Sequence, residues 1–232
     1  MRLLTAIAVN TAFAIAGHRA RTVSVSGAVG GALIGTVIYA ALGPAAWLFL
    51  VATFGVASVA SRLGLAEKTR LGIAEERGGR RAAGNAVANC GVAALAAVAA
   101  AATPFGSAAR LAFVAALTAG GSDTVASEIG KAWGRSTFLV TSLARVDAGT
   151  PGAMSARGTA AGLAAAVGLA ALGVGLGLIT RASIVAVVAG STIGALAESV
   201  LGATLERRGI LNNDALNFIN TAIAAGAALA IA

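Results

Sequence analysis

The chain has 232 residues, of which 58% are hydrophobic and 11% are charged, against about 25% charged residues in an average soluble domain. Its mean hydropathy of +0.87 and its repeated long apolar runs exclude a soluble domain and predict a polytopic membrane protein, because about 20 apolar residues span the hydrocarbon as a helix. The net charge of +8 does not indicate a nucleic-acid partner, because the basic residues stand in short loops between the apolar runs.

The apolar runs, taken in chain order, predict eight membrane spans in a single integral membrane domain, residues 1–232. The expected fold is all-α, a polytopic transmembrane helix bundle packed through small Gly and Ala residues. Gly27, Gly31 and Gly35 form a small-xxx-small ridge suited to such packing, although generic lipid-compatible filler explains any single glycine equally well. The expected spans are 3–17, 24–42, 45–61, 85–102, 107–128, 159–179, 183–202 and 215–231.

The first span has a competing interpretation as a signal peptide, because Ala14-Ile15-Ala16 resembles a cleavage site. Only Arg2 precedes the apolar run, and Arg19 and Arg21 follow it directly. This distribution of charge favours a retained helix.

Four loops hold most of the basic residues: 18–23, 62–84, 129–158 and 203–214. They contain two, six, four and two Lys or Arg, which is 14 of the 17 in the chain. The positive-inside rule therefore predicts that these loops face the cytoplasm and that both termini lie outside. All nine acidic residues fall in these loops or in the adjoining halves of the spans, so we expect the active site on the cytoplasmic side.

The most polar part of the chain is 120–158, where Asp123 directly follows an apolar run. Asp123 and Ser127 are four residues apart, as are Thr124 and Glu128, so a helix places them on two adjacent stripes of one face. Two carboxylates with neighbouring hydroxyls suit Mg²⁺, and ionisable groups in a membrane are rare unless they have a function. The alternative is that these carboxylates form structural ion pairs with Lys131 or with Arg135.

A glycine-rich loop, 149–158, ends the same stretch. Its three glycines permit tight backbone paths whose N–H groups can bind a phosphate. Ser155 is placed to cap the following helix, whose N-terminus favours anions, and Arg145 and Arg157 supply positive charge. A loop that merely joins two helices would look the same, and the sequence is not the Walker A pattern.

Loop 62–84 and the span after it add further polar candidates. Lys68 and Arg81 in the loop suit phosphate oxygens, but they also fit topology-setting charge and attraction to anionic lipid. Asn85 and Asn89 are four residues apart in a membrane helix. Because unsatisfied amides are costly there, they either bridge helices or face a polar cavity, and both interpretations stay open.

The last two spans contribute acids and amides of their own. Glu198 is the only ionisable group in its span, and Asp214 and Asn217 open the final one, where an Asn or Asp is expected to cap the helix. Convergence of Glu198, Asp214 and Asn217 on Asp123 would create a polar cavity in the cytoplasmic leaflet.

The rare reactive residues limit the chemistry further. His18 is the only histidine and Cys90 the only cysteine. A His-based zinc site and a Ser-His-Asp triad are therefore not expected, an internal disulfide is excluded, and Cys90 is interpreted as a small packing residue.

At these residues the sequence resembles the phytyl-phosphate kinase family of vitamin E biosynthesis and its prokaryotic relatives, the integral membrane domain-of-unknown-function family 92. The most specific piece is Asp-Thr-x-Ala-Ser-Glu-Ile-Gly, residues 123–130. The family usually has Asp where this chain has Glu198, and Gly where it has Ala153. The other resembling pieces are 24–27, Ser58 and Ser61 with Lys68, 81–91, 149–159, 198–204, and Asn213 and Asp214 with Asn217.

The resemblance implies a membrane-embedded lipid (isoprenoid) phosphate kinase that transfers a phosphoryl group from a nucleoside triphosphate, CTP favoured, to a phytyl- or prenyl-type monophosphate, with Mg²⁺ as cofactor. Such an acceptor needs charge neutralisation and in-line positioning rather than a strong base. Its tail would lie between small-residue helices, open to lipid, and a homodimer is an option. The alternative is a transporter or carrier of an anionic lipid or metabolite, but transporters place polar groups near the midplane.

These implications assign expected roles to individual residues. The expected catalytic residues are Asp123, Glu128 and Lys131. The expected metal ligands are Asp123, Glu128, Glu198 and Asp214. The residues expected to bind substrate phosphate or nucleotide are Lys68, Arg81, Asn85, Asn89, Ser127, Arg145, Gly149, Thr150, Gly152, Ser155, Arg157, Gly158 and Asn217.

Overall fold

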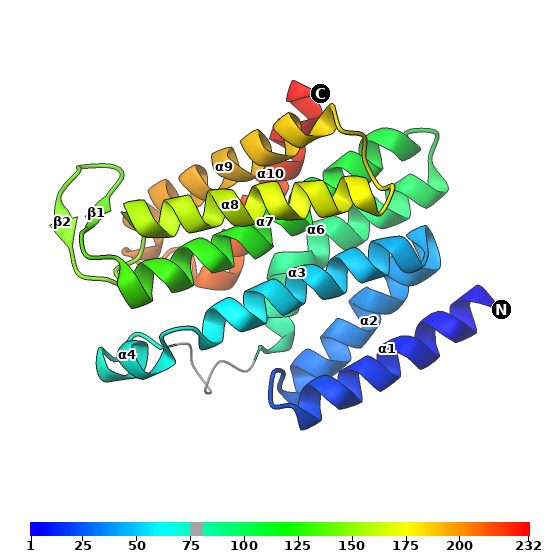
Figure 1. Ribbon diagram of the computed structural model, residues 1–232, viewed down its shortest axis with the longest axis horizontal. Coiled ribbons are helices and arrows are strands. Elements are labelled where there is room, and N and C mark those ends of the chain that lie inside the picture. The colour runs from blue at the N-terminus through cyan, green and yellow to red at the C-terminus, as the bar shows by residue number, and fades with distance from the viewer. Residues whose placement is uncertain (75–80) are drawn as a thin grey trace.

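The computed structural model describes residues 1–74 and 81–232 as an all-α bundle (Figure 1). Arg77 and Arg80, which were counted among the charges of loop 62–84, lie outside the described residues. Each of the eight predicted spans coincides with a long helix, which confirms the predicted fold class. The long helices are α1 (Arg2–Arg19), α2 (Val25–Leu42), α3 (Pro44–Arg62), α6 (Ala83–Ala102), α7 (Gly106–Trp133), α8 (Ala156–Gly175), α9 (Ser183–Leu201) and α10 (Asn213–Ile231).

Within the described residues, six of these helices are long and apolar enough to cross a membrane. The multi-pass architecture is therefore confirmed, whereas the number of eight crossings stays a prediction. The two helices outside this group are α1 and α7. Helix α7 carries Asp123, Glu128 and Lys131 within its length, and these charges lower its hydropathy.

Helix α7 is nevertheless at the centre of the bundle. Every residue from 111 to 122 is buried, and the helix packs against α3, α6, α8, α9 and α10. Small side chains permit this close packing: a Cβ at Gly162 of α8 would lie 2.7 Å from the Ala126 Cβ of α7. The long helix with the most charged residues is thus enclosed by protein, which allows it to hold charges at membrane depth.

Short elements form one end of the bundle, at the left of Figure 1. A three-stranded antiparallel sheet, order β2-β1-β3, consists of β1 (Thr137–Leu139), β2 (Arg145–Val146) and β3 (Ala153–Ser155). The sequence was interpreted here only as a glycine-rich loop, because strands of two or three residues are too short for a periodic signal. Helix α4 (Leu65–Arg70) and the π-helix η1 (Gly202–Glu206) lie at the same end.

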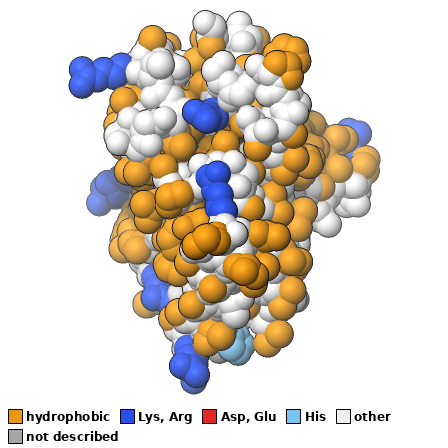
Figure 2. Space-filling view, turned by 90° about the vertical axis from the view of Figure 1, so that its right-hand side faces the viewer, with side chains coloured by type: hydrophobic (Ala, Val, Ile, Leu, Met, Phe, Trp, Pro, Cys, Tyr) orange, Lys and Arg blue, Asp and Glu red, His pale blue; other side chains and the backbone are white. Residues whose placement is uncertain are grey.

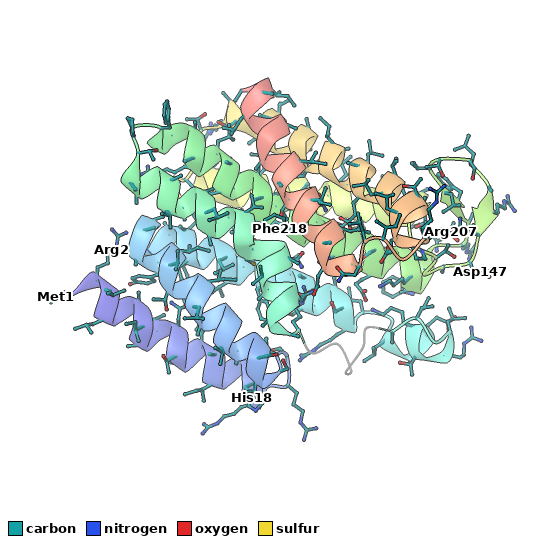
Figure 3. All side chains as sticks on the ribbon, turned by 180° about the vertical axis from the view of Figure 1, so that it is seen from behind. Met1, Arg2, His18, Asp147, Arg207 and Phe218 are labelled. Carbon is teal, nitrogen blue, oxygen red and sulfur yellow. The ribbon has the colours of Figure 1, made fainter. Side chains whose placement is uncertain are left out.

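Contacts join the four predicted loops at this end. The Arg81 amide donates to the Thr22 carbonyl at 3.1 Å, which joins the first loop to the second. The α-carbon of Gly149 faces the Ile73 side chain, which joins the second to the third, and Gly152 lies against the backbone of Ala203, which joins the third to the fourth. In Figure 3, Asp147 and Arg207 lie at this end and Met1 and Arg2 at the opposite one.

The opposite end faces the viewer in Figure 2. Hydrophobic side chains, other uncharged side chains and backbone cover most of it, with isolated Lys and Arg side chains and a His, and no acidic side chain of the described residues is visible. Acidic groups, which a cation site needs, are therefore found away from this face.

Candidate active site

A cavity of about 330 Å³ lies at the loop end, between α7, α8, α9, α10 and the glycine-rich loop. It brings together residues from segments far apart in the sequence. The predicted site residues that line it are Arg81, Asn85, Asn89, Asp123, Ser127, Lys131, Gly149, Thr150, Gly152, Ser155, Gly158, Glu198 and Asn217.

Two carboxylates from different helices face this cavity. Asp123 of α7 and Glu198 of α9 both line it and are close enough to repel each other electrostatically. Glu206 of η1, which the sequence analysis did not select, also lines the cavity and repels Glu198. Lys131 is attracted to Asp123 and Glu206. The cavity therefore combines acidic groups that favour a cation with basic groups that favour an anion.

A buried amide holds Glu198 in place. The Nδ2 of Asn220 donates to the Glu198 Oε2 at 2.6 Å, and Asn220 itself is fully buried in α10. The sequence analysis missed Asn220. Its signal was available, since an amide in an apolar span is costly unless it is bonded, and Asn217 lies three residues earlier on the same face.

Glu128 does not line the cavity, and its roles as metal ligand and catalytic residue stay predictions. The carboxylate is buried, and both of its oxygens are bound: Lys68 Nζ donates to Oε2, and Lys131 Nζ donates to Oε1 at 3.1 Å. Lys68 is fully buried and also donates to the Ser61 carbonyl at 2.8 Å. The bond to Lys131 is the ion pair expected as the alternative, and Lys68 is a second partner that the sequence did not indicate.

Three further predicted residues lie away from the cavity. Arg145 is exposed on β2, and the exposed Arg157 donates to the Trp133 carbonyl at 3.0 Å, where it satisfies the end of α7. Asp214 is in the first turn of α10 and lies beside Gly84, which is in the first turn of α6. A negative charge is favourable at the start of a helix. Their charges stabilise helix ends or face solvent, and their roles in binding a phosphate or a metal stay predictions.

The glycine-rich loop forms one wall of the cavity. The amides of Thr150 and Ala153 donate to carbonyls of the loop itself, at 3.2 Å and 2.9 Å. Pro151 has no N–H, so the Gly149 and Gly152 amides are the ones in 149–153 that donate to none of the described residues. The predicted backbone cradle therefore reduces to two amides.

The Ser155 hydroxyl accepts a bond from the Gly158 amide at 3.1 Å, which confirms the predicted cap of α8.

Two orphaned polar atoms also point to a ligand. The Ser191 Oγ and the Asn89 Oδ1 are buried without a hydrogen-bond partner among the described residues, and both residues line the cavity. Buried polar atoms are rarely left unpaired. Asn85 also lines the cavity, and its Oδ1 accepts from Arg81 at 3.0 Å. The two asparagines therefore face a polar cavity, which was one of the two interpretations of their spacing.

Gly152 connects the loop to η1 and gives a testable consequence. Its φ is +75°, and a Cβ there would overlap the backbone of Ser199 and Ala203. We expect Gly152→Ala to cost about 1 kcal/mol for the left-handed φ and about 1 to 3 kcal/mol more for overpacking. Gly209→Ala is the matched control, because Gly209 has φ +69° and open space around it. Thermal unfolding in detergent measures both, and equal losses would contradict the proposed contact.

A family model described as "Integral membrane protein DUF92" matches residues 8–225. The chain is 44% identical to an uncharacterized membrane protein, sll0875, of Synechocystis sp., over 86% of this chain and 78% of that protein. It is 39% identical to Protein VTE6, chloroplastic, of Arabidopsis thaliana, over 86% of this chain and 62% of that protein. It is 31% identical to an uncharacterized membrane protein, MJ0933, of Methanocaldococcus jannaschii, over 96% and 91% of the two chains. No solved structure matches the chain.

Proposed function

The chain belongs to the DUF92 family of integral membrane proteins, and on this premise we propose that it is a kinase that phosphorylates an isoprenoid monophosphate with a nucleoside triphosphate, CTP favoured. The observation that carries the proposal is the polar cavity at the loop end of a membrane bundle, which Asp123, Glu198 and Lys131 line together with Gly149 and Gly152, whose amides donate to none of the described residues. The specific run 123–130, which carries the resemblance to phytyl-phosphate kinases, forms its central wall.

The lining of the cavity suits phosphoryl transfer between two anionic substrates. Such a reaction depends on positioning and on stabilisation of charge on the phosphate oxygens, with little covalent chemistry for the protein. Lys131 and Arg81 supply positive charge at two sides of the cavity, and the Gly149 and Gly152 amides supply N–H donors. The acceptor phosphate is already a nucleophile, so the site needs no histidine as general base.

The carboxylates fit Mg²⁺ as the cofactor. Mg²⁺ is bound through one or two carboxylates, with substrate phosphates and waters completing the shell. Asp123 and Glu198 are the two that would hold it, since they come from facing helices and repel each other. Among the described residues, no group of three or more His, Cys, Asp or Glu is arranged for a metal, which agrees with a site completed by substrate. When bound, the ion would neutralise phosphate charge.

We further propose that the cavity opens to the cytoplasm, as the distribution of basic residues indicates. Segments that contain Lys and Arg lie at this end of the bundle: α4 and the loops after α1, α7 and η1. The nucleotide would then enter from the compartment where it is made.

A phosphotransfer assay tests this function. Purified protein receives farnesyl or phytyl monophosphate and each nucleoside triphosphate in turn, and the prenyl diphosphate is measured by mass spectrometry. We expect product with at least one nucleotide, none after EDTA, and recovery on addition of Mg²⁺. In sealed vesicles, product should form only when the nucleotide is on the cytoplasmic side. Absence of transfer with every nucleotide, together with passage of the monophosphate across the vesicle, would favour a carrier instead.

A further inference from the structure

A second cavity, of about 350 Å³, lies beside the first, among α1, α2, α3, α6 and α7. Its walls are almost entirely apolar and use small residues where the helices come close. On α2, Gly27, Ala28, Gly31 and Ala32 line it, so two glycines of the predicted ridge, Gly27 and Gly31, face this space. At Gly31 a Cβ would meet nothing within 4 Å.

The two cavities share part of their lining. Arg81, Asn85, Asn89 and Thr124 line both of them. Three of these four residues come from 81–89 and one from the central helix α7, so the polar cavity ends where the apolar one begins. A ligand with a charged head and a hydrocarbon tail can therefore place its head in the first cavity and its tail in the second.

The apolar cavity is partly open, and its lining extends from Arg81 to Asn10 and Trp47. Ser61 on α3 bonds Arg81 at 3.4 Å, and Trp47 lies 14 residues earlier on the same helix, about 21 Å along its axis. There the Trp47 Nε1 donates to the Asn10 Oδ1 at 2.9 Å, and the Phe13 ring packs edge-on against Trp47 with centroids 4.9 Å apart. The Asn10 Nδ2 donates to the Ala6 carbonyl. The polar atoms at this end therefore have hydrogen-bond partners, and the surface around them is apolar.

The volume limits the length of a tail that fits. An apolar cavity of about 150 Å³ holds benzene, which has six carbons. In proportion, a cavity of about 350 Å³ holds roughly 14 carbons, close to three isoprene units. A tail of this size would also account for the abundance of small residues around the cavity, because larger side chains would fill the space.

We propose that this second cavity binds the hydrocarbon tail of the lipid monophosphate, up to about three isoprene units, and that the Asn10–Trp47 pair forms its far end. The proposal rests on the proposed function for the identity of the head group. The tail then lies between α1, α2, α3, α6 and α7, in a cavity that is partly open. Gly31 is then a specificity residue for tail length.

Photocrosslinking tests tail binding without requiring turnover. The probe is farnesyl monophosphate with a diazirine at the far end of its tail, crosslinked to the purified protein and mapped by peptide mass spectrometry. We expect adducts near Phe13 and Trp47, and at least a tenfold lower yield in Gly31→Leu, whose side chain would occupy the cavity. Gly226→Leu is the matched control, because Gly226 also has nothing within 4 Å of a Cβ and does not line the cavity.

Turnover separates failure of this inference from failure of the proposed function. If the kinase activity exists, Gly31→Leu should raise the KM for farnesyl monophosphate at least tenfold and leave the KM for isopentenyl monophosphate, with its five-carbon tail, unchanged. Adducts confined to lipid-facing positions, or equal yields in Gly31→Leu and the wild type, would overturn the tail site even if phosphate transfer occurs. Adducts at Phe13 and Trp47 without any transfer would support the tail site and refute the kinase.

Discussion

Asp123→Asn is expected to lower kcat for phosphate transfer by about 100- to 1,000-fold, the range for removal of one preorganised electrostatic contact. Asp123 lines the polar cavity on the central helix α7, opposite Glu198 and near Lys131. The amide has nearly the same shape as the carboxylate but no charge for a metal or a phosphate-bound cation. The helix should stay intact, so the unfolding temperature of the variant should remain close to that of the wild type.

Asp147→Asn is the matched control, because Asp147 is an exposed acid on the loop before Gly149 and does not line the cavity. Steady-state kinetics with a prenyl monophosphate and the active nucleotide should give wild-type kcat for this control. Full turnover by Asp123→Asn would refute the assignment of this carboxylate to the reaction. Equal losses in both variants would mean that negative charge at the loop end acts generally.

Glu128→Gln is expected to reduce stability by about 3 to 5 kcal/mol, the cost of leaving a buried charge without its partner. Lys68 is fully buried against Glu128, and this pair attaches the short helix α4 to α7. Neutralising the carboxylate leaves the Lys68 ammonium with uncharged acceptors such as the Ser61 carbonyl. Thermal unfolding of the purified protein measures the effect.

The double variant Lys68→Met with Glu128→Gln should recover most of that loss, because it removes the buried cation as well. Disruption of the exposed Glu67–Arg70 pair on the same helix is the control and should leave the unfolding temperature unchanged. A Glu128→Gln protein that is as stable as the wild type but inactive would instead return Glu128 to the metal site, as its place in the motif first suggested.

The fold followed closely from the sequence because long apolar runs have a single stable form in a membrane. Helices such as α2 and α9 begin and end within one residue of the predicted spans, 24–42 and 183–202. The caps at Ser155 and Asn212 were also predictable, since each side chain accepts from an amide three residues later. The sheet β2-β1-β3 was not, because its strands are shorter than any readable period.

The candidate site was predictable where residue type alone decides the outcome. A carboxylate such as Asp123 or Glu198 in an apolar helix must face protein or water, so their meeting in one cavity could be expected. Which cation reaches which carboxylate depends on tertiary contacts. Lys68 and Glu128 are 60 residues apart in the chain. Their positions in the sequence did not indicate that Lys68, on an adjacent helix, would form an ion pair with Glu128.

Transfer of labelled phosphate tests the central claim most directly. Wild-type protein is incubated with Mg²⁺, farnesyl monophosphate and a nucleoside triphosphate, first CTP, that carries ³²P only at the γ position, and the lipid fraction is separated. The kinase predicts label in farnesyl diphosphate and none in that product from Asp123→Asn. Label that appears only as free phosphate, or stays in the nucleotide for every base, would contradict it.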